Sequence, residues 1–268
     1  MGKYLHVLGI GLQNTLVYRA NFLFRAAFGL VPLAGTLFLW RAIYAGRPAG
    51  ESINGYTVAQ MMSYYLVLTL VDAFPAVAED DWHIAADIKD GQISQFLLKP
   101  IDYLKYRLSL YMAGRVVYTT CAMLPVAVFM AFQWDSVVGP ASGGALAFAL
   151  LATFLAGLLQ FFIAYTVALL AFWVLDVSTF IFTQFALEYL ASGHLFPLDL
   201  LPGWLHQLLM CTPYPYLLYF PVGVYLGRIS GAAIWQGLAI QMLWVAVGYG
   251  LARWVFYRGI RKYSAVGG

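Results

Sequence analysis

Long, nearly uncharged apolar runs dominate this chain and set the first limit on its fold. Six runs approach or exceed the roughly 20 residues that a helix needs to cross the apolar core of a bilayer. Only 10% of the residues are charged and 62% are hydrophobic, whereas soluble domains carry about 25% charged residues. The runs are continuous, unlike the alternating strands of a membrane barrel. We therefore predict an all-α polytopic membrane protein with one transmembrane domain over residues 1–268. The predicted spans are about 21–45, 57–78, 108–133, 144–175, 178–196 and 232–256.

Lysine and arginine are divided very unevenly between the two sides that these spans define. Twelve of the 15 lie in the N-terminal stretch, between the second and third spans and just into the third, or at the C-terminal end. Arg41, Arg47 and Arg228 fall on the opposite side. Because cytoplasmic loops carry the excess of basic residues, we expect both termini to be cytoplasmic in a bacterial inner membrane. Six crossings also return the chain to its starting side.

The stretch 3–20 precedes the first predicted span and has a different character. It lacks the compact apolar core and cleavage site of a signal peptide, so we expect none. Leu5, Leu8, Leu12 and Leu16 fall near one helical face, which predicts a helix lying at the membrane interface. The alternative is a longer first span.

The loop 79–107 carries much of the chain's charge between two apolar spans, so it must lie in water. Asp80 and Asp81 favour a helix start and Gly91 a helix end, which predicts a short helix between them. Ser94 is a candidate cap for a second turn, closed by Pro100. Within the first helix, Ile84 and Ile88 form an apolar ridge, which we expect to be exposed. Such a helix could dock on a soluble protein or lie at the lipid headgroups.

Residues 88–101, IKDGQISQFLLKPI, resemble a loop motif of the ABC type-2 exporter permeases. In that family this loop supplies a coupling helix that docks on a cytosolic ATPase subunit. The resemblance therefore implies an ATPase-coupling role for a set of residues within the loop. They are Ile84, Asp87, Ile88, Gly91, Phe96, Leu97 and Pro100.

Residues 191–227 contain five of the eleven prolines, which forbids one continuous spanning helix there. The apolar content predicts a re-entrant hairpin over 195–227, made of two short helices that dip into the outer leaflet and break at Pro202 and Pro213. Trp204, Tyr214, Tyr216 and Tyr219 suit the membrane–water interface. The proline pattern also resembles the signature after the fifth span of the same permeases, which implies an outer gate. Its candidate residues are Pro197, Pro202, Trp204, Pro213 and Tyr216.

Gln184, Glu188 and Ser192 recur every fourth residue, so they share one face of the fifth predicted span. A carboxylate at membrane depth faces the bundle interior or a wet cavity. This face is our candidate lining of a translocation path; the alternative is a hydrogen-bonded Glu188 that joins helices. Asp72, near the cytoplasmic end of the second span, is interpreted as an interfacial carboxylate beside Arg107 or Arg115.

The sequence has no G-x-x-x-x-G-K-[ST] motif, so we expect this chain to bind no cofactor and to be no enzyme itself. ATP and Mg²⁺ would sit on a partner ATPase, expected in two copies by analogy with the family, beside a second permease chain in a homodimer or heterodimer. No motif for nucleic acid or metal is present.

The resulting hypothesis is the permease subunit of an ABC exporter. Alternatives are a channel or secondary carrier without an ATPase, and an acyltransferase using His194 and Asp199. Many aromatic residues suit an amphipathic or lipid-like cargo, and they suit lipid contact equally well.

Overall fold

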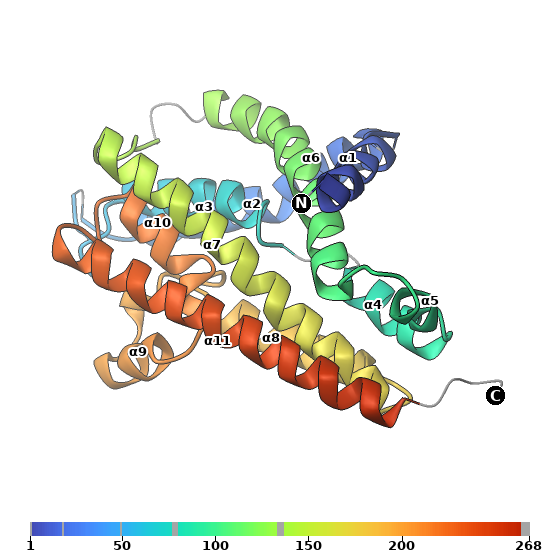
Figure 1. Ribbon diagram of the computed structural model, residues 1–268. Helices are drawn as coiled ribbons and strands as arrows, with labels where there is room; N and C mark the ends of the chain where they lie inside the picture. The colour runs from blue at the N-terminus through green and yellow to red at the C-terminus, as the bar shows by residue number, and fades with distance from the viewer. Residues whose placement is uncertain (1, 18, 49, 77–79, 133–136, 264–268) are drawn as a thin grey trace.

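The computed structural model describes residues 2–17, 19–48, 50–76, 80–132 and 137–263, and these residues form an assembly of helices and connecting loops (Figure 1). No strand occurs among them; the sole β-type pairing found there is an isolated bridge between Ile53 and Tyr56. The all-α prediction is confirmed.

Four helical segments are long and apolar enough to cross a membrane: Ala20–Ala45, Tyr103–Phe132, Gly143–Phe172 and Ala232–Lys262. They correspond to α2 (Arg19–Ala45), α6 (Tyr103–Phe132), α7 (Gly143–Ala168) with its 3-10 extension η2 (Leu169–Phe172), and α11 (Ala232–Lys262). At 1.5 Å per residue, 26 to 31 residues exceed the thickness of a bilayer core. Large apolar side chains such as Phe28, Phe132 and Leu243 are exposed along them. Together, length and outward apolar surface indicate a multi-pass membrane protein.

Two predicted spans correspond to shorter helices, α3 (Val58–Asp72, 15 residues) and α8 (Ser178–Ala191, 14 residues). A capping box between Thr57 and Gln60 fixes the start of α3. The expected spans 57–78 and 178–196 were longer; residues 77 and 78 lie outside the described residues. Both helices fall short of a full crossing, so the six-span count stays a prediction.

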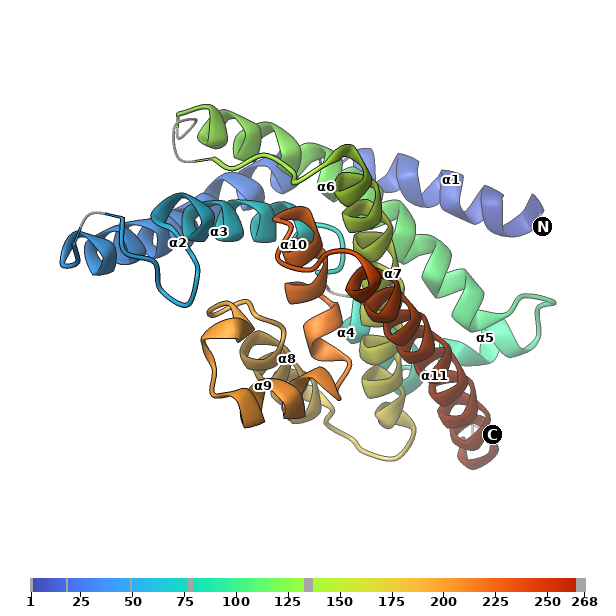
Figure 2. The ribbon, with the colours of Figure 1, turned by 90° about the vertical axis from the view of Figure 1, so that its left-hand side faces the viewer.

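The N-terminal helix α1 (Gly2–Val17) lies along α6, as Figure 2 shows. Gly11 makes this approach close, because a Cβ there would come within 2.9 Å of the Ala113 side chain. The predicted helix within 3–20 is therefore present. Its junction with α2 falls at residue 18, outside the described residues, and the interfacial position stays a prediction.

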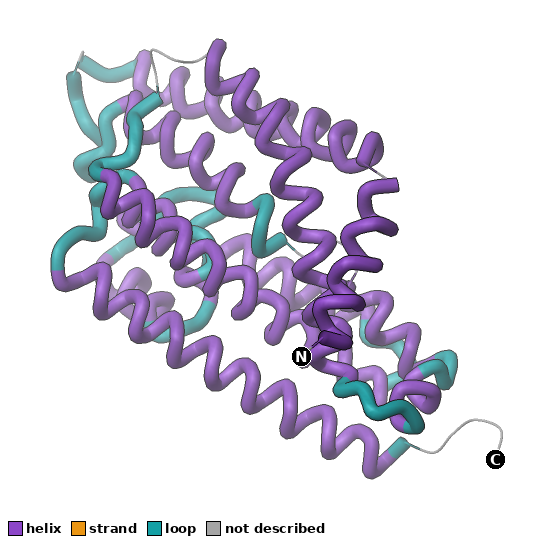
Figure 3. The backbone as a smooth tube through the Cα atoms, turned by 45° about the horizontal axis from the view of Figure 1, so that its top comes forward, coloured by secondary structure: helices purple, strands orange, loops and turns teal. Residues whose placement is uncertain are grey.

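The buried centre lies where α10 (Tyr219–Tyr225) packs against α7 and α3. α7 and α11 lie side by side in both ribbon views (Figures 1 and 2). Loops gather at two ends of the helices (Figure 3). The α2–α3 and α10–α11 connections lie at one end, and the segment from α4 to α6 lies at the other, near the end of α11 (Figure 1).

Candidate functional site

The charged loop folds into α4 (Asp80–Lys89) and α5 (Ile93–Leu97), separated by a tight turn. Gly91 adopts φ +75° in this turn, a left-handed conformation that favours glycine. The predicted first helix is confirmed. The capping expectation is wrong, because Gln92 precedes α5 and Ser94 lies inside it, 3.2 Å from the Tyr263 hydroxyl.

Asp87 joins α4 to the first turns of α6. Its carboxylate pairs with the Arg107 guanidinium and accepts a hydrogen bond from the Tyr103 hydroxyl at 2.6 Å. Arg107 also donates from Nε to the Tyr103 oxygen (3.0 Å) and from a terminal nitrogen to the His83 carbonyl (3.1 Å). The first turns of α6 therefore fix the orientation of α4.

The apolar ridge of α4 faces the protein interior. Ile84 and Ile88 are 1% and 3% exposed, and they pack in one buried cluster with Ile93, Tyr165 and Phe256. The expectation that Ile84 and Ile88 are exposed was wrong, because the neighbouring helices already offer an apolar surface that covers them. These isoleucines therefore pack the loop against the long helices of the same chain.

Further contacts tie the loop to both ends of the sequence. The Asp102 backbone N–H donates to the Tyr4 hydroxyl at 3.0 Å, and the Asp102 carboxylate pairs with Arg253 at 2.6 Å. Lys3 donates to the Pro100 carbonyl. Helices α1, α6 and α11 therefore hold this segment jointly.

The tip of the loop remains exposed despite these contacts. Phe96 packs against Tyr103 and Tyr106, with ring centroids 5.1 and 4.8 Å apart. Beside it, Leu97 is 45% exposed and Leu98 89% exposed, and Pro100 is exposed as well. A firmly held segment thus presents apolar side chains to its surroundings. The assignment of coupling residues to this segment stays a prediction.

The predicted outer hairpin contains η3 (Leu198–Leu200), α9 (Gly203–Met210), η4 (Tyr214–Tyr216) and α10. The chain breaks where proline was expected to break it, with Pro202 and Pro213 immediately preceding α9 and η4. Trp204 is exposed, but Tyr216 and Tyr219 are buried. The interfacial expectation for these two tyrosines is therefore wrong, because η4 and α10 both pack into the buried core.

The segment that links α8 to this hairpin is irregular backbone inside the molecule. Tyr64 and Tyr65 donate from their hydroxyls to the carbonyls of Gly193 (2.7 Å) and Leu195 (2.9 Å). The Tyr219 N–H donates to the Ser192 carbonyl at 2.9 Å. Irregular backbone at membrane depth needs such partners within the protein. Pro197, just beyond, is also buried.

Asp199 belongs to a network at the end of the molecule opposite α4. Its two carboxylate oxygens accept hydrogen bonds from Tyr219 (2.5 Å) and Tyr56 (2.6 Å). Arg228 lies 3.7 Å from the same carboxylate and 4.1 Å from the centre of the Tyr56 ring. These partners occupy the carboxylate, so the arrangement does not favour a catalytic pair with His194.

The polar face of α8 makes contacts across the bundle. Gln160 of α7 donates to the Glu188 carboxylate at 2.6 Å, and Tyr214 donates to the Gln184 side-chain oxygen at 2.9 Å. Gln184 and Glu188 line a cavity of about 330 Å³ that Arg25 also lines. Ser192 is fully buried and does not line this cavity.

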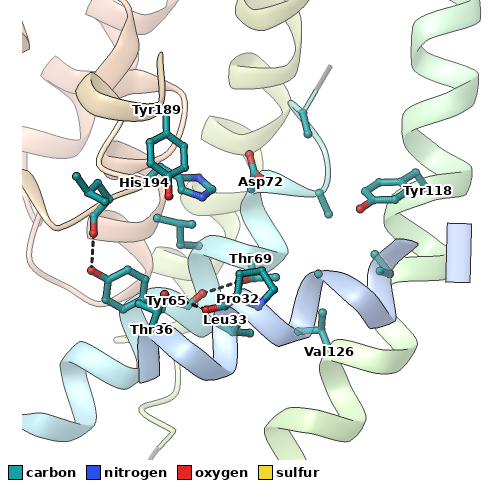
Figure 4. Close-up of a pocket in the computed structure, with 17 residues that line it drawn as sticks. Pro32, Leu33, Thr36, Tyr65, Thr69, Asp72, Tyr118, Val126, Tyr189 and His194 are labelled. Atoms are coloured by element: carbon teal, nitrogen blue, oxygen red, sulfur yellow. Dashed lines mark hydrogen bonds between the residues drawn. The ribbon is translucent and has the colours of Figure 1, made fainter. Parts of the chain in front are cut away.

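A second cavity, of about 290 Å³, lies between α2, α3, α6 and the segment after α8 (Figure 4). Asp72 and His194 point into it together with Tyr118 and Tyr189. Arg107, one of the two partners expected for Asp72, forms its ion pair with Asp87 instead. The other, Arg115, does lie near Asp72. Pairing Asp72 with His194 from sequence was impossible, because tertiary packing brings the two residues together across the chain.

Among the described residues, no group of three or more His, Cys, Asp or Glu side chains is arranged to hold a metal ion.

The family model described as "ABC-2 family transporter protein" matches residues 30–267. This chain belongs to the ABC-2 transporter family. No curated protein and no solved structure matches it. The match covers the charged loop and the proline-rich hairpin, the two segments on which the resemblance to type-2 permeases rests. Membrane components of ABC-2 transporters lack an ATPase site and work with ATP-binding subunits.

Proposed function

We propose that this chain is the transmembrane permease subunit of an ABC exporter and moves an amphipathic or lipid-like substrate outward across the bacterial inner membrane. The observation that carries this proposal is the combination of a held α4–α5 segment with an exposed apolar tip. A segment that transmits force from an ATPase must be fixed to the membrane helices, and its tip must be free to contact the partner. The outward direction rests on the resemblance to type-2 exporters.

Coupling in this proposal passes through Asp87 and the buried isoleucines. Leu97, Leu98 and Pro100 contact the ATPase, while Ile84 and Ile88 transfer its displacement to α6, α7 and α11. Gly91 provides the turn between the two short helices. Two ATPase subunits and a second permease chain complete the transporter, and ATP-driven closure would switch access between the two sides.

The topology in this proposal has six crossings with both termini cytoplasmic. The separation of loops supports it, since Arg47 and Arg228 lie in connections at the end opposite α4–α5 (Figure 1). Gln184 and Glu188 line the path, and Ser192, which is fully buried, lies at the end of the same helix. Its outer gate involves Pro197, Pro202, Trp204, Pro213 and Tyr216.

Purification of the tagged chain from its native membrane in mild detergent tests the proposal. We expect a soluble subunit with a P-loop to co-purify in roughly stoichiometric amount. The permease chains present in the purified complex then distinguish a homodimer from a heterodimer. Absence of such a subunit, even after gentle cross-linking, would favour a channel or secondary carrier.

A further inference from the structure

The cavity in Figure 4 combines one carboxylate with a mainly apolar and aromatic wall. Leu33, Leu68 and Val126 contribute aliphatic surface, and the rings of Tyr65 and Tyr118 lie beside them. Its volume of about 290 Å³ is near the lower end of the range for small-molecule sites. Such a space admits a compact organic group together with part of a longer apolar body.

Asp72 stands at the wall of this cavity without a direct partner. Among the described residues, no hydrogen bond or ion pair reaches its carboxylate; His194 and Arg115 act on it electrostatically from farther away. Arg115 is committed elsewhere, because its guanidinium donates to the Ala76 carbonyl and lies 5.5 Å from the ring centre of Tyr118. A carboxylate among apolar groups is costly unless a cation or hydrogen-bond donor compensates for it.

The aromatic rings add a second reason to expect a cation. Tyr65, Tyr118 and Tyr189 come from three helices and line the same space. A cation near the face of an aromatic ring is attracted by the negative charge density of that face. A carboxylate with several tyrosines therefore suits an ammonium group attached to an apolar body, and it disfavours an anion.

We propose that the cavity lined by Asp72, Tyr118, Tyr189 and His194 binds an amphipathic organic cation, an amine or quaternary ammonium compound. Its role as a substrate site rests on the proposed function, but binding itself does not. The Asp72 carboxylate holds the cationic group, and the aliphatic surface of α2 and α6 holds the apolar part. His194 and Arg115 also act electrostatically on Asp72.

Equilibrium dialysis of the purified chain in lipid nanodiscs, with benzyltrimethylammonium as the probe and benzenesulfonate as its anionic counterpart, tests this site. We expect the cation to bind at least tenfold more tightly than the sulfonate. Asp72→Asn should weaken cation binding at least tenfold, and Asp72→Glu should restore part of it. Asp176→Asn, which alters an exposed carboxylate outside the cavity, is the matched control and should change nothing.

Equal binding of the two probes, or unchanged binding in Asp72→Asn, would overturn the proposal. If Asp72→Asn fails to fold, lowering the pH on the wild-type chain replaces it. Protonation of the Asp72 carboxylate should then weaken cation binding, and unchanged affinity between pH 8 and pH 4 would contradict the site. The binding assay contains no ATPase, so its outcome is independent of the proposed exporter function. A wild-type chain that does not bind the cation rejects the cation site, whereas a missing ATPase in the co-purification experiment rejects the exporter proposal.

Discussion

The Arg107 guanidinium pairs with the Asp87 carboxylate and thereby joins α4 to α6. The Tyr103 hydroxyl donates to the same carboxylate oxygen, so one side chain of α4 receives two donors from one face of α6. The Arg107 and Asp87 side chains are only 12% and 20% exposed. This pair is therefore screened less by water than a surface ion pair would be.

Asp87→Asn should loosen α4 without disturbing the long helices. The amide keeps a contact with Tyr103 but removes the negative charge opposite Arg107, and hydrogen bonds to charged groups contribute about 1.5–3 kcal/mol. Hydrogen–deuterium exchange should therefore accelerate about tenfold or more across α4, with α7 and α11 unchanged. Asp90→Asn, an exposed carboxylate just after α4, is the control, and equal exchange in both variants would contradict this role of Asp87.

Gly193→Ala should destabilise the irregular segment after α8. Gly193 has φ +86°, and a Cβ there would lie 2.7 Å from the Tyr64 hydroxyl and 3.0 Å from the Tyr219 Cβ. Strain of this kind costs on the order of 1–3 kcal/mol, so the midpoint of thermal unfolding in detergent should fall by several degrees. Gly203→Ala meets nothing within 4 Å and should leave the midpoint nearly unchanged. Equal midpoints for both variants would show that this segment tolerates a side chain.

Ile88→Ala should lower the stability of the chain, whereas Leu98→Ala should weaken its binding to the ATPase. Ile88 is buried, so truncation should cost about 2–5 kcal/mol of local or global stability. Leu98 is 89% exposed, so its truncation should leave thermal unfolding unchanged and weaken retention of the ATPase during purification. Thermal melts and quantified co-purification distinguish them. A Leu98→Ala chain that retains its full complement of ATPase would remove this leucine from the docking surface.

Glu188→Gln tests whether Glu188 lines the translocation path or only joins α7 to α8. Glutamine still offers an oxygen to the Gln160 amide, which donates to Glu188 at 2.6 Å, so stability should be close to that of the wild type. Glu188→Leu removes this acceptor and should cost about 1–3 kcal/mol. If Glu188 lines the path, Glu188→Gln should reduce substrate-stimulated ATPase activity severalfold in the reconstituted transporter. Unaltered stimulation would instead mean that Glu188 serves to join α7 and α8.

The features that followed from sequence were those set by local rules. Run length predicted the four long helices, and Gly91, Pro202 and Pro213 correctly marked turns because backbone geometry at glycine and proline depends little on tertiary context. The helix containing Asp87 was predicted for the same reason. Local rules could not say which face of a short amphipathic helix would be covered, so Ile84 and Ile88 were misjudged.

Contacts over long separations in sequence were beyond prediction. Asp72 and His194 share a cavity, and Tyr56 contacts Asp199, because folding brings together segments more than 100 residues apart. Asp72 and Asp199 are each a lone charged residue in an apolar stretch of sequence, which makes them notable but does not identify their partners. The burial of Tyr216 and Tyr219 was missed because tyrosine suits both an interface and a hydrogen-bonded core.

Site-specific photocross-linking in native membranes tests the central claim most directly. A photoreactive amino acid at position 98 should form a covalent product with a soluble ATPase subunit. The same group at position 132, where Phe132 is 83% exposed at the opposite end of α6, should give little or none. The coupling model predicts that a P-loop ATPase is captured from position 98 and that little or none is captured from position 132. Capture of lipid alone at position 98, with no ATPase product, would contradict it.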